Sequence, residues 1–248
     1  MRLLVCDTSN SNCSAGIFED GKEICYELSF EKLTHSETFM PLVNRMMVKA
    51  GLKHEDLDGY AVTVGPGSFT GIRIGLAAVK GMALAAGKRC IAVSSTEALA
   101  RSCENVTMTP KSETLIVPAI DARNNRVFAQ AAEDDTLRSL LPEDAYDADD
   151  LVAKIEKIPE IIYGARRQII VVGSGATGMN KAFEKAGSGL NIYYAPGAAI
   201  VPQGVARAAF ASSEFIDARD LKASYCAVSQ AERLRKAEAD PKSSETDK

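Results

Sequence analysis

The sequence is poor in the residues from which metal sites are usually built. It contains no tryptophan and only two histidines, His35 and His54. Its six cysteines include no C-x-x-C pair. Zinc sites draw on closely spaced cysteine and histidine ligands, and no such spacing occurs here. The sequence therefore argues against a metal centre.

An excess of basic charge and a long apolar run are also absent. The formal net charge of −4 gives no overall attraction for nucleic acid, so contact with RNA would need a local basic patch or a partner. No run reaches the length of a membrane span, and the N-terminus MRLLVCDTSN lacks the apolar core of a signal peptide. Unpaired cysteines without an export signal favour a reducing compartment. We expect a cytoplasmic chain without membrane contact.

The first half of the chain alternates strand-like and helix-like segments. Residues 2–30 predict a meander of strands, with a polar turn that begins at Asp7. Apolar residues then recur at helical spacing, followed by a strand, a glycine-rich turn and a strongly apolar helix. The expected helices are 35–50, 71–86 and a short one from 94, and the expected strands are 60–64 and 90–93.

A polar segment at 105–113 precedes a second meander whose turn also begins with an aspartate, Asp121. The expected strands are 115–120, 127–132, 168–172 and 191–194, the expected helices are 151–158, 179–186 and 204–211, and the acidic segment 133–150 is a loop or a hairpin. Both halves thus show strand, Asp turn, strand and later a glycine turn before a helix, which suggests an internal duplication. The charged tail after Gln230 predicts a frayed helix end followed by disorder.

The glycine-rich segment GPGSFTGIRIGLAAVKG (65–81) admits two interpretations. A phosphate-binding P-loop requires G-x-x-x-x-G-K-[ST], which is absent, and Gly71 stands one place too late for a dinucleotide fingerprint. The alternative is packing, because Gly67, Gly71 and Gly75 lie four residues apart and allow another backbone to approach closely. A helix that is apolar all round must be buried on all sides, and a second protein chain is a natural cover.

Two further features remain open at this point. The stripe of Phe39, Leu42, Val43, Met46 and Met47 fits core packing as well as a partner-binding face, since methionines adapt to a foreign surface. Arg73, near the start of the glycine-rich helix, is either an ordinary surface arginine or a contact for an anion or a partner carboxylate.

Several segments together resemble the bacterial TsaB (YeaZ) family, and the match runs through nearly the whole chain. They are VCDTSNSNCSAGIF, HSETFMPLV, TVGPGSFTGIRIGLAAVKGMALAAGK, DARNNRVFAQ, VVGSGATG and AVSQAERLR. The resemblance implies an α/β, two-lobed actin/Hsp70-like (ASKHA) fold with duplicated mixed-sheet ribonuclease H-like domains. It also implies a non-catalytic scaffold or activator that binds TsaD for threonylcarbamoyl transfer to adenosine 37 of ANN-decoding tRNA. TsaE is the implied third partner, and tRNA contact would be indirect.

The resemblance also implies how the chain is divided and where it binds. The N-terminal lobe would comprise 1–105 and the returning residues 200–248, and the second lobe 106–199. Two helices would form the face for TsaD, and the chain alone would form a homodimer through that face. The expected interface residues are Phe39, Leu42, Val43, Met46, Met47, Ile72, Leu76, Val79 and Met82.

The runner-up is a catalytic ASKHA enzyme, either a TsaD-like transferase or a small-molecule kinase. The transferase motif N-H-L-E-G-H falls on residues 94–99, where Ser95 and Leu99 replace the metal-binding histidines. Kinases of this class carry glycines after each hairpin aspartate, and neither Asp7 nor Asp121 is followed by one. We expect no required cofactor, while weak or partner-completed ATP/ADP binding stays open. The residues for it would be Asp7, Thr8, Ser9, Gly67, Arg73, Gly173 and Gly175.

Overall fold

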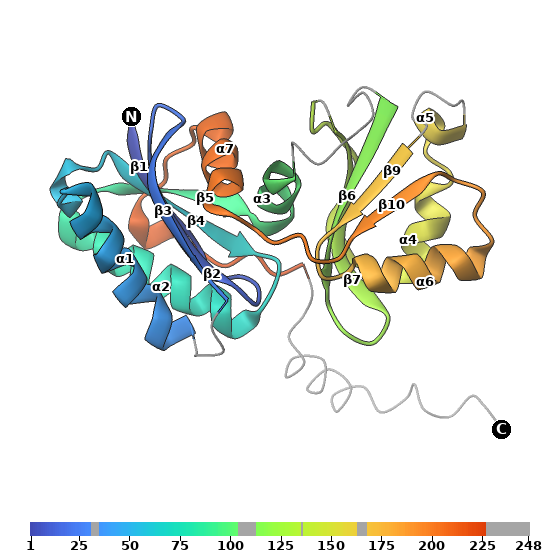
Figure 1. Cartoon of the computed structure of the whole chain (residues 1–248), viewed down its shortest axis with the longest axis horizontal. Coiled ribbons are helices and arrows are strands. Elements are labelled where there is room, and N and C mark those ends of the chain that lie inside the picture. Colours follow the sequence, from blue (N-terminus) through green and yellow to red (C-terminus); the bar gives the residue numbers. More distant parts are fainter. Residues whose placement is uncertain (31–34, 104–112, 135, 163–167, 227–248) are drawn as a thin grey trace.

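The computed structural model describes residues 1–30, 35–103, 113–134, 136–162 and 168–226, arranged as two lobes side by side (Figure 1). Each lobe contains one five-stranded sheet. The first sheet has the order β3-β2-β1-β4-β5, from β1 (Arg2–Asp7), β2 (Cys13–Glu19), β3 (Lys22–Ser29), β4 (Gly59–Gly65) and β5 (Arg89–Ser94). The second has the order β10-β9-β6-β7-β8, from β6 (Thr114–Asp121), β7 (Arg126–Glu133), β8 (Ser139–Asp147), β9 (Gln168–Val172) and β10 (Ile192–Ala195).

The two sheets repeat one topology. In each, the first three strands form an antiparallel meander, and the first strand also pairs in parallel with the fourth, which pairs in parallel with the fifth. The internal duplication expected from the two Asp turns is therefore confirmed. For the acidic segment 133–150 the sequence left a loop or a hairpin open. It forms a hairpin, because β8 pairs antiparallel with β7.

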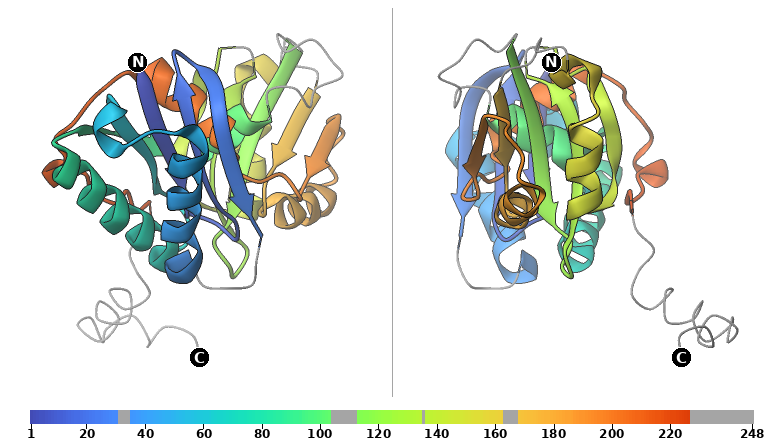
Figure 2. Two further views of the ribbon diagram at one scale, coloured as in Figure 1. Left: turned by 60° about the vertical axis from the view of Figure 1, so that its left-hand side comes forward. Right: turned by 90° about the vertical axis from the view of Figure 1, so that its right-hand side faces the viewer.

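Helices cover both faces of both sheets, and one pair lies between the lobes (Figures 1 and 2). The helices are α1 (His35–Ala50), α2 (Phe69–Ala86), α3 (Ser95–Ser102), α4 (Ala148–Ile155), α5 (Pro159–Ile162), α6 (Ala176–Ala186) and α7 (Pro202–Ser212), with the 3-10 turns η1 (His54–Asp56) and η3 (Ala218–Asp220). α1 and α2 lie together on the outer face of the first sheet, and α4 and α6 pack on the second. α3 and α7 share one hydrophobic cluster with both sheets, so they join the lobes.

Caps explain why two helices begin earlier than the sequence predicted. The side chain of Ser68 accepts a hydrogen bond from the Gly71 N–H, so α2 begins at Phe69 rather than at residue 71. Asp147 caps α4 in the same way through the Asp149 N–H, so that helix begins at residue 148 and ends at Ile155. Helix α1 has the predicted bounds.

The chain returns to the first lobe after the second sheet. α7 contacts the strands of the first sheet and lies directly on α3, where a Cβ on Gly204 would be only 2.4 Å from the Ala98 carbonyl oxygen. The predicted lobe boundary at 105–106 lies outside the described residues, and the division at 199–200 stays a prediction. The tail after Gln230 also lies outside them.

Residues 213–226, here called the C-terminal strap, follow the edge of the first lobe. Ile216 exchanges two backbone hydrogen bonds with Cys90 on β5, the edge strand of the first sheet. The strap thereby covers part of the unpaired edge of that strand. Lys80 of α2 donates to the carbonyls of Arg219 and Leu221. The strap therefore holds one side of α2, a contact that the sequence analysis did not anticipate.

Among the described residues, one helix is long and apolar enough by length and composition to cross a membrane. It is α2, and 39% of its 18-residue window is buried within the protein. Its inward face belongs to the core of the first lobe.

Candidate functional site

The glycine-rich segment packs against the turn between β1 and β2. A Cβ on Gly71 would lie 2.0 Å from the Thr8 carbonyl oxygen, one on Gly75 would lie 2.3 Å from Thr8 Oγ1, and one on Gly67 would lie 2.4 Å from the Ser9 carbonyl oxygen. Thr8 Oγ1 also donates to the Gly71 carbonyl over 2.8 Å. The packing interpretation is correct, but these glycines meet the chain's own turn rather than a second protein.

Asp7 is enclosed by this contact. Its Oδ1 accepts hydrogen bonds from the Ser9 N–H, the Ser9 hydroxyl and the Thr63 hydroxyl at 3.0, 2.6 and 2.6 Å. Its Oδ2 is buried without a hydrogen-bonding partner in the described structure. Burial raises the pKa of Asp7, although these hydrogen bonds oppose the shift. Asp7 and Thr8 are both fully buried in this structure, and their role as nucleotide contacts stays a prediction.

A cleft of about 870 Å³ opens between the lobes beside this turn. Its walls are Ser9, Asn10, Ser11, Gly67, Ser68, Phe69, Thr70, Ile120, Asp121, Ala122, Arg123, Asn124, Phe128 and Ser174. Of the predicted nucleotide residues it thus contains Ser9, which is itself fully buried, and Gly67. On the second lobe, Asp121 Oδ1 accepts a hydrogen bond from the Arg123 N–H over 2.8 Å, and Arg123 and Asn124 have positive φ. Side chains fill the places where glycines would let a phosphate approach.

The second glycine turn is also a packing device. A Cβ on Gly173 would lie 2.5 Å from the Ala119 carbonyl oxygen, and the Gly175 N–H donates to the same oxygen over 2.9 Å. Arg73 does not line the cleft. Its Nε donates to Tyr225 Oη over 3.1 Å, and Tyr225 stacks on Phe69 with ring centroids 4.7 Å apart. Arg73 thus contacts the C-terminal strap, and its role toward an anion or a partner carboxylate stays a prediction.

The residues at the transferase metal position do not fit a metal. Ser95 is fully buried, and Leu99 is 1% exposed with its Cδ2 2.5 Å from where a Gly173 Cβ would lie. Within the described ranges, no group of three His, Cys, Asp or Glu side chains could hold a metal ion. All six cysteines are free thiols, and burial raises the pKa of Cys13 to about 12 and that of Cys103 to about 11.

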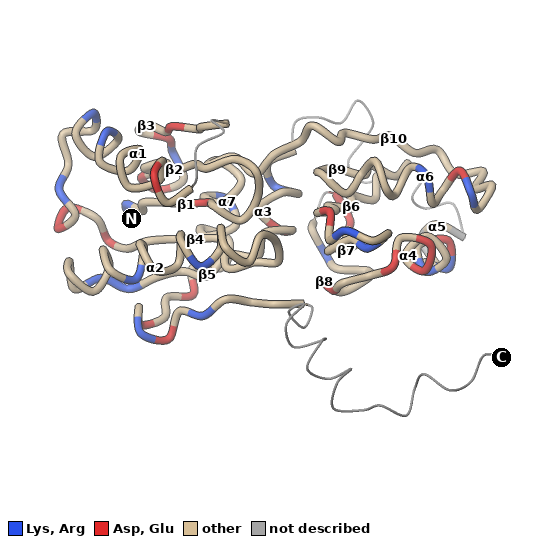
Figure 3. Tube along the Cα trace, turned by 90° about the horizontal axis from the view of Figure 1, so that it is seen from below, with Lys and Arg blue, Asp and Glu red and all other residues tan. Residues whose placement is uncertain are grey.

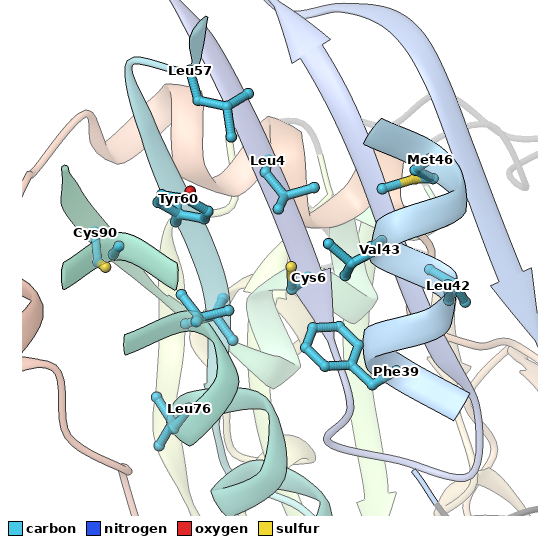
Figure 4. Close-up of a cluster of buried hydrophobic side chains, with 14 of the residues drawn as sticks. Leu4, Cys6, Phe39, Leu42, Val43, Met46, Leu57, Tyr60, Leu76 and Cys90 are labelled. Carbon is cyan, nitrogen blue, oxygen red and sulfur yellow. The ribbon is translucent and has the colours of Figure 1, made fainter. Parts of the chain in front are cut away.

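The side chains predicted to bind a partner lie instead in the core of the first lobe. Figure 4 shows Phe39, Val43 and Met46 pointing from α1 toward Leu4 and Cys6 of the sheet. Eight of the nine predicted interface residues are at most 6% exposed, namely Phe39, Leu42, Val43, Met46, Met47, Ile72, Leu76 and Val79, while Met82 is half-buried. The eight buried side chains cannot contact a partner from this position, because they pack on the apolar face of the sheet, whereas Met82 stays a predicted interface residue.

The outward side of the same helices forms a different surface. A groove of about 460 Å³, here called the α1–α2 groove, is lined by Met40, His54, Glu55, Ala77, Ala78, Gly81, Met82, Ala85 and Ala86. On the same two helices, outside the groove lining, Leu84 is 52% exposed and Val48 is 73% exposed. The sequence predicted a docking face on these two helices but assigned it mainly to the inward stripe, and of the predicted residues Met82 alone is in the groove lining.

Charge is nearly absent from α2. The helix carries only Arg73 and Lys80 as charged residues, so most of its tube is tan in Figure 3. Both of these side chains bind the C-terminal strap. The groove side of α2 therefore presents alanine, glycine and methionine without a charged group.

One polar contact is built into the groove wall. His54 Nδ1 lies 2.8 Å from Tyr60 Oη, and the rings stack with centroids 6.1 Å apart. Tyr60 is fully buried on β4, and burial raises the pKa of its hydroxyl. Nothing in the sequence pattern indicated this pair.

A family model described as "TsaD: tRNA N6-adenosine threonylcarbamoyltransferase" matches residues 31–246. The chain is 30% identical over 139 residues to the tRNA threonylcarbamoyladenosine biosynthesis protein TsaB of Haemophilus influenzae, an alignment covering 56% of this chain and 57% of the relative. It is 33% identical over 129 residues to TsaB of Escherichia coli, covering 52% and 53%. The chain thus spans little more than half the length of these curated relatives in the alignments.

A solved structure gives the fold over nearly the whole length. YeaZ from Pseudomonas aeruginosa superposes with a TM-score of 0.72 at 21% identity, covering 90% of this chain and 99% of that one. With the duplicated sheets, this defines a two-lobed α/β protein of the actin/Hsp70-like (ASKHA) class, as predicted. Within that class, the chain belongs to the family that the matching model describes, in its TsaB/YeaZ branch.

The glycine contacts predict opposite effects of one substitution at two positions of α2. Gly71→Ala should destabilise the fold by about 1–3 kcal/mol, because the new methyl group would overlap the Thr8 carbonyl oxygen. Gly81→Ala should raise stability by up to about 1 kcal/mol, because Gly81 has open space around it and alanine favours the helix. Chemical denaturation of both variants checks this, and equal effects would contradict the packing contact.

The enclosed carboxyl predicts a pH dependence of stability. Because the folded-state pKa of Asp7 is raised above its ordinary value of 3.8, its contribution is most favourable below that pH and is lost as the pH rises through the folded-state pKa. Wild type should therefore lose stability relative to Asp7→Asn as the pH rises above 3.8. Unfolding free energies of both proteins across that range measure the difference. A constant difference would contradict a raised pKa.

Proposed function

We propose that this chain is a non-catalytic subunit in the biosynthesis of threonylcarbamoyladenosine in tRNA, and that it acts by binding the transferase TsaD. The observation that carries the proposal is the α1–α2 groove, an open and nearly uncharged surface on a protein that uses its glycine turns for internal packing. The names of the curated relatives supply the pathway. The reaction served would be threonylcarbamoyl transfer to adenosine 37 of ANN-decoding tRNA.

The matching family model supports TsaD as the occupant of the groove. That model describes the transferase, and its match to residues 31–246 includes both α1 and α2. A partner built on the same helix pair can present the same kind of face, so the two chains can pair about an approximate two-fold axis. Ala77, Gly81 and Ala85 follow one another at helical spacing, which lets a partner helix approach closely. Met40 and Met82 can adapt their shape to the opposing helix.

The role is proposed as non-catalytic because of the residues that stand at the metal-binding and phosphate-binding positions of related enzymes. Ser95 and Leu99 stand where the transferase motif has its metal-binding histidines, and neither offers an imidazole. Asp7 is fully buried, and the residues that follow Asp121 carry side chains where kinases of this class have glycines. A required cofactor is therefore not part of the proposal. The interlobe cleft leaves room for weak ATP or ADP binding that a partner completes.

The remaining partners follow from the same assignment. TsaE would join a ternary complex with TsaD, and tRNA would be contacted through that complex rather than by this acidic chain alone. In the absence of TsaD, two copies would cover their grooves as a homodimer. The site of action would be the cytoplasm, where tRNA is modified and where free thiols persist.

The groove predicts a selective effect of a bulky residue at Gly81. Gly81→Leu should weaken binding to the TsaD of the same organism by at least about tenfold, because the side chain would project into open space where the partner helix docks. Gly178→Leu is the matched control, since Gly178 is also an open helical glycine but lies on α6 of the second lobe. Titration calorimetry of each variant with TsaD gives both affinities.

The control separates docking from folding. Both substitutions replace glycine by a better helix former, so both proteins should be at least as stable as wild type. If Gly81→Leu binds TsaD as tightly as Gly178→Leu does, the groove is not the docking surface. If wild type does not bind TsaD at all, the proposed function fails.

A further inference from the structure

The α1–α2 groove contains one polar side chain whose position is fixed from inside the fold. His54 and Glu55 are its only ionisable lining residues, and the others are Ala, Gly or Met. The His54 ring is stacked on Tyr60 and bonded through Nδ1 to its hydroxyl at 2.8 Å. Because Tyr60 is fully buried on β4, it cannot move without disturbing the core. The imidazole is thus anchored from behind while it faces the groove.

The buried hydroxyl also determines which nitrogen of His54 carries the proton. In the part of the chain that the structure describes, His54 Nδ1 is the one hydrogen-bonding partner of Tyr60 Oη. If Nδ1 donated this bond, the hydroxyl proton of Tyr60 would be buried without an acceptor, which is unfavourable. Tyr60 must therefore donate to Nδ1. The neutral imidazole then carries its proton on Nε2, the nitrogen that remains available to a partner.

We propose that the Nε2–H of His54 is the polar anchor of the α1–α2 groove and donates a hydrogen bond to an acceptor oxygen on the docked TsaD helix. This inference rests on the proposed function and adds a determinant of specificity to it. The apolar lining is non-directional, so alone it would let a docked helix slide along α2. A single fixed donor sets the register, because a partner without an oxygen opposite His54 would leave the Nε2–H unpaired.

Two substitutions separate this anchor from the structural role of His54. The oxygen of an asparagine side chain takes the place of Nδ1, so His54→Asn keeps an acceptor for Tyr60 and loses the groove donor. A glutamine amide reaches the place of Nε2, so His54→Gln restores a donor to the groove. We expect His54→Asn to weaken TsaD binding by about fivefold, and His54→Gln to stay within about twofold of wild type. Calorimetric titration with TsaD measures both, beside Gly81→Leu.

The tautomer can be read in the free chain without a partner. In the neutral form of the ring, the ¹⁵N shifts of His54 should show a proton on Nε2 and a bare Nδ1 in wild type. A proton on Nδ1 would overturn the inference, and so would equal TsaD affinities of wild type and His54→Asn while Gly81→Leu weakens binding. If Gly81→Leu has no effect either, the docking surface itself is refuted, and the anchor fails together with the proposed function.

Discussion

The contact on which this structure depends is the close approach of α2 to the turn between β1 and β2. Gly71 and Gly75 carry no side chain at the points where the backbone and hydroxyl of Thr8 touch the helix. This contact orients α2 about its axis, since the face that carries the two glycines must point toward the sheet. Ile72 and Val79 share that face and enter the core. Everything that α2 presents to solvent follows from this constraint.

The same contact encloses the Asp7 side chain, which is fully buried. The hydrogen-bond donors of Asp7 lie within the chain, since the hydroxyls of Ser9 and Thr63 both donate to its Oδ1. At the other lobe the second glycine turn packs on Ala119 in a comparable way. The cleft between the lobes remains, but its walls carry Arg123 and Asn124 rather than bare backbone. In both lobes, therefore, the glycines allow close packing of the chain on itself.

Sequence patterns were sufficient where the signal was local or repeated. The apolar stripe of α1 indicated a helix, and two Asp turns within two meanders indicated the duplicated sheets. The direction in which the helices face was beyond these patterns. A stripe of Phe39 and Met46 looks the same whether a sheet or a partner covers it, and α2 is too uniformly apolar for periodicity to distinguish its sides. The answer came from a glycine contact with a turn more than sixty residues away.

The C-terminal strap and the His54–Tyr60 pair escaped prediction for a related reason. The strap has neither helical nor strand periodicity over residues 213–226, and its contacts with Cys90 and Lys80 are all distant in sequence. His54 is only six residues from Tyr60, yet the importance of their hydrogen bond depends on Tyr60 being fully buried, which is a tertiary property. Such a contact adds no pattern to the sequence.

The groove reconciles two opposing requirements on an exposed apolar surface. A surface that binds another protein must be desolvated at low cost, but large exposed apolar side chains promote aggregation. Along the groove, α2 meets both demands with Ala77, Gly81 and Ala85, which expose little apolar area each and leave a hollow instead of a ridge. Such a surface gains most when a second helix fills the hollow, because contact area then rises steeply with shape complementarity. The strap binds Arg73 and Lys80 on the helix flank, so α2 itself contributes no charge to that hollow, and the ionisable groups of its lining are His54 and Glu55.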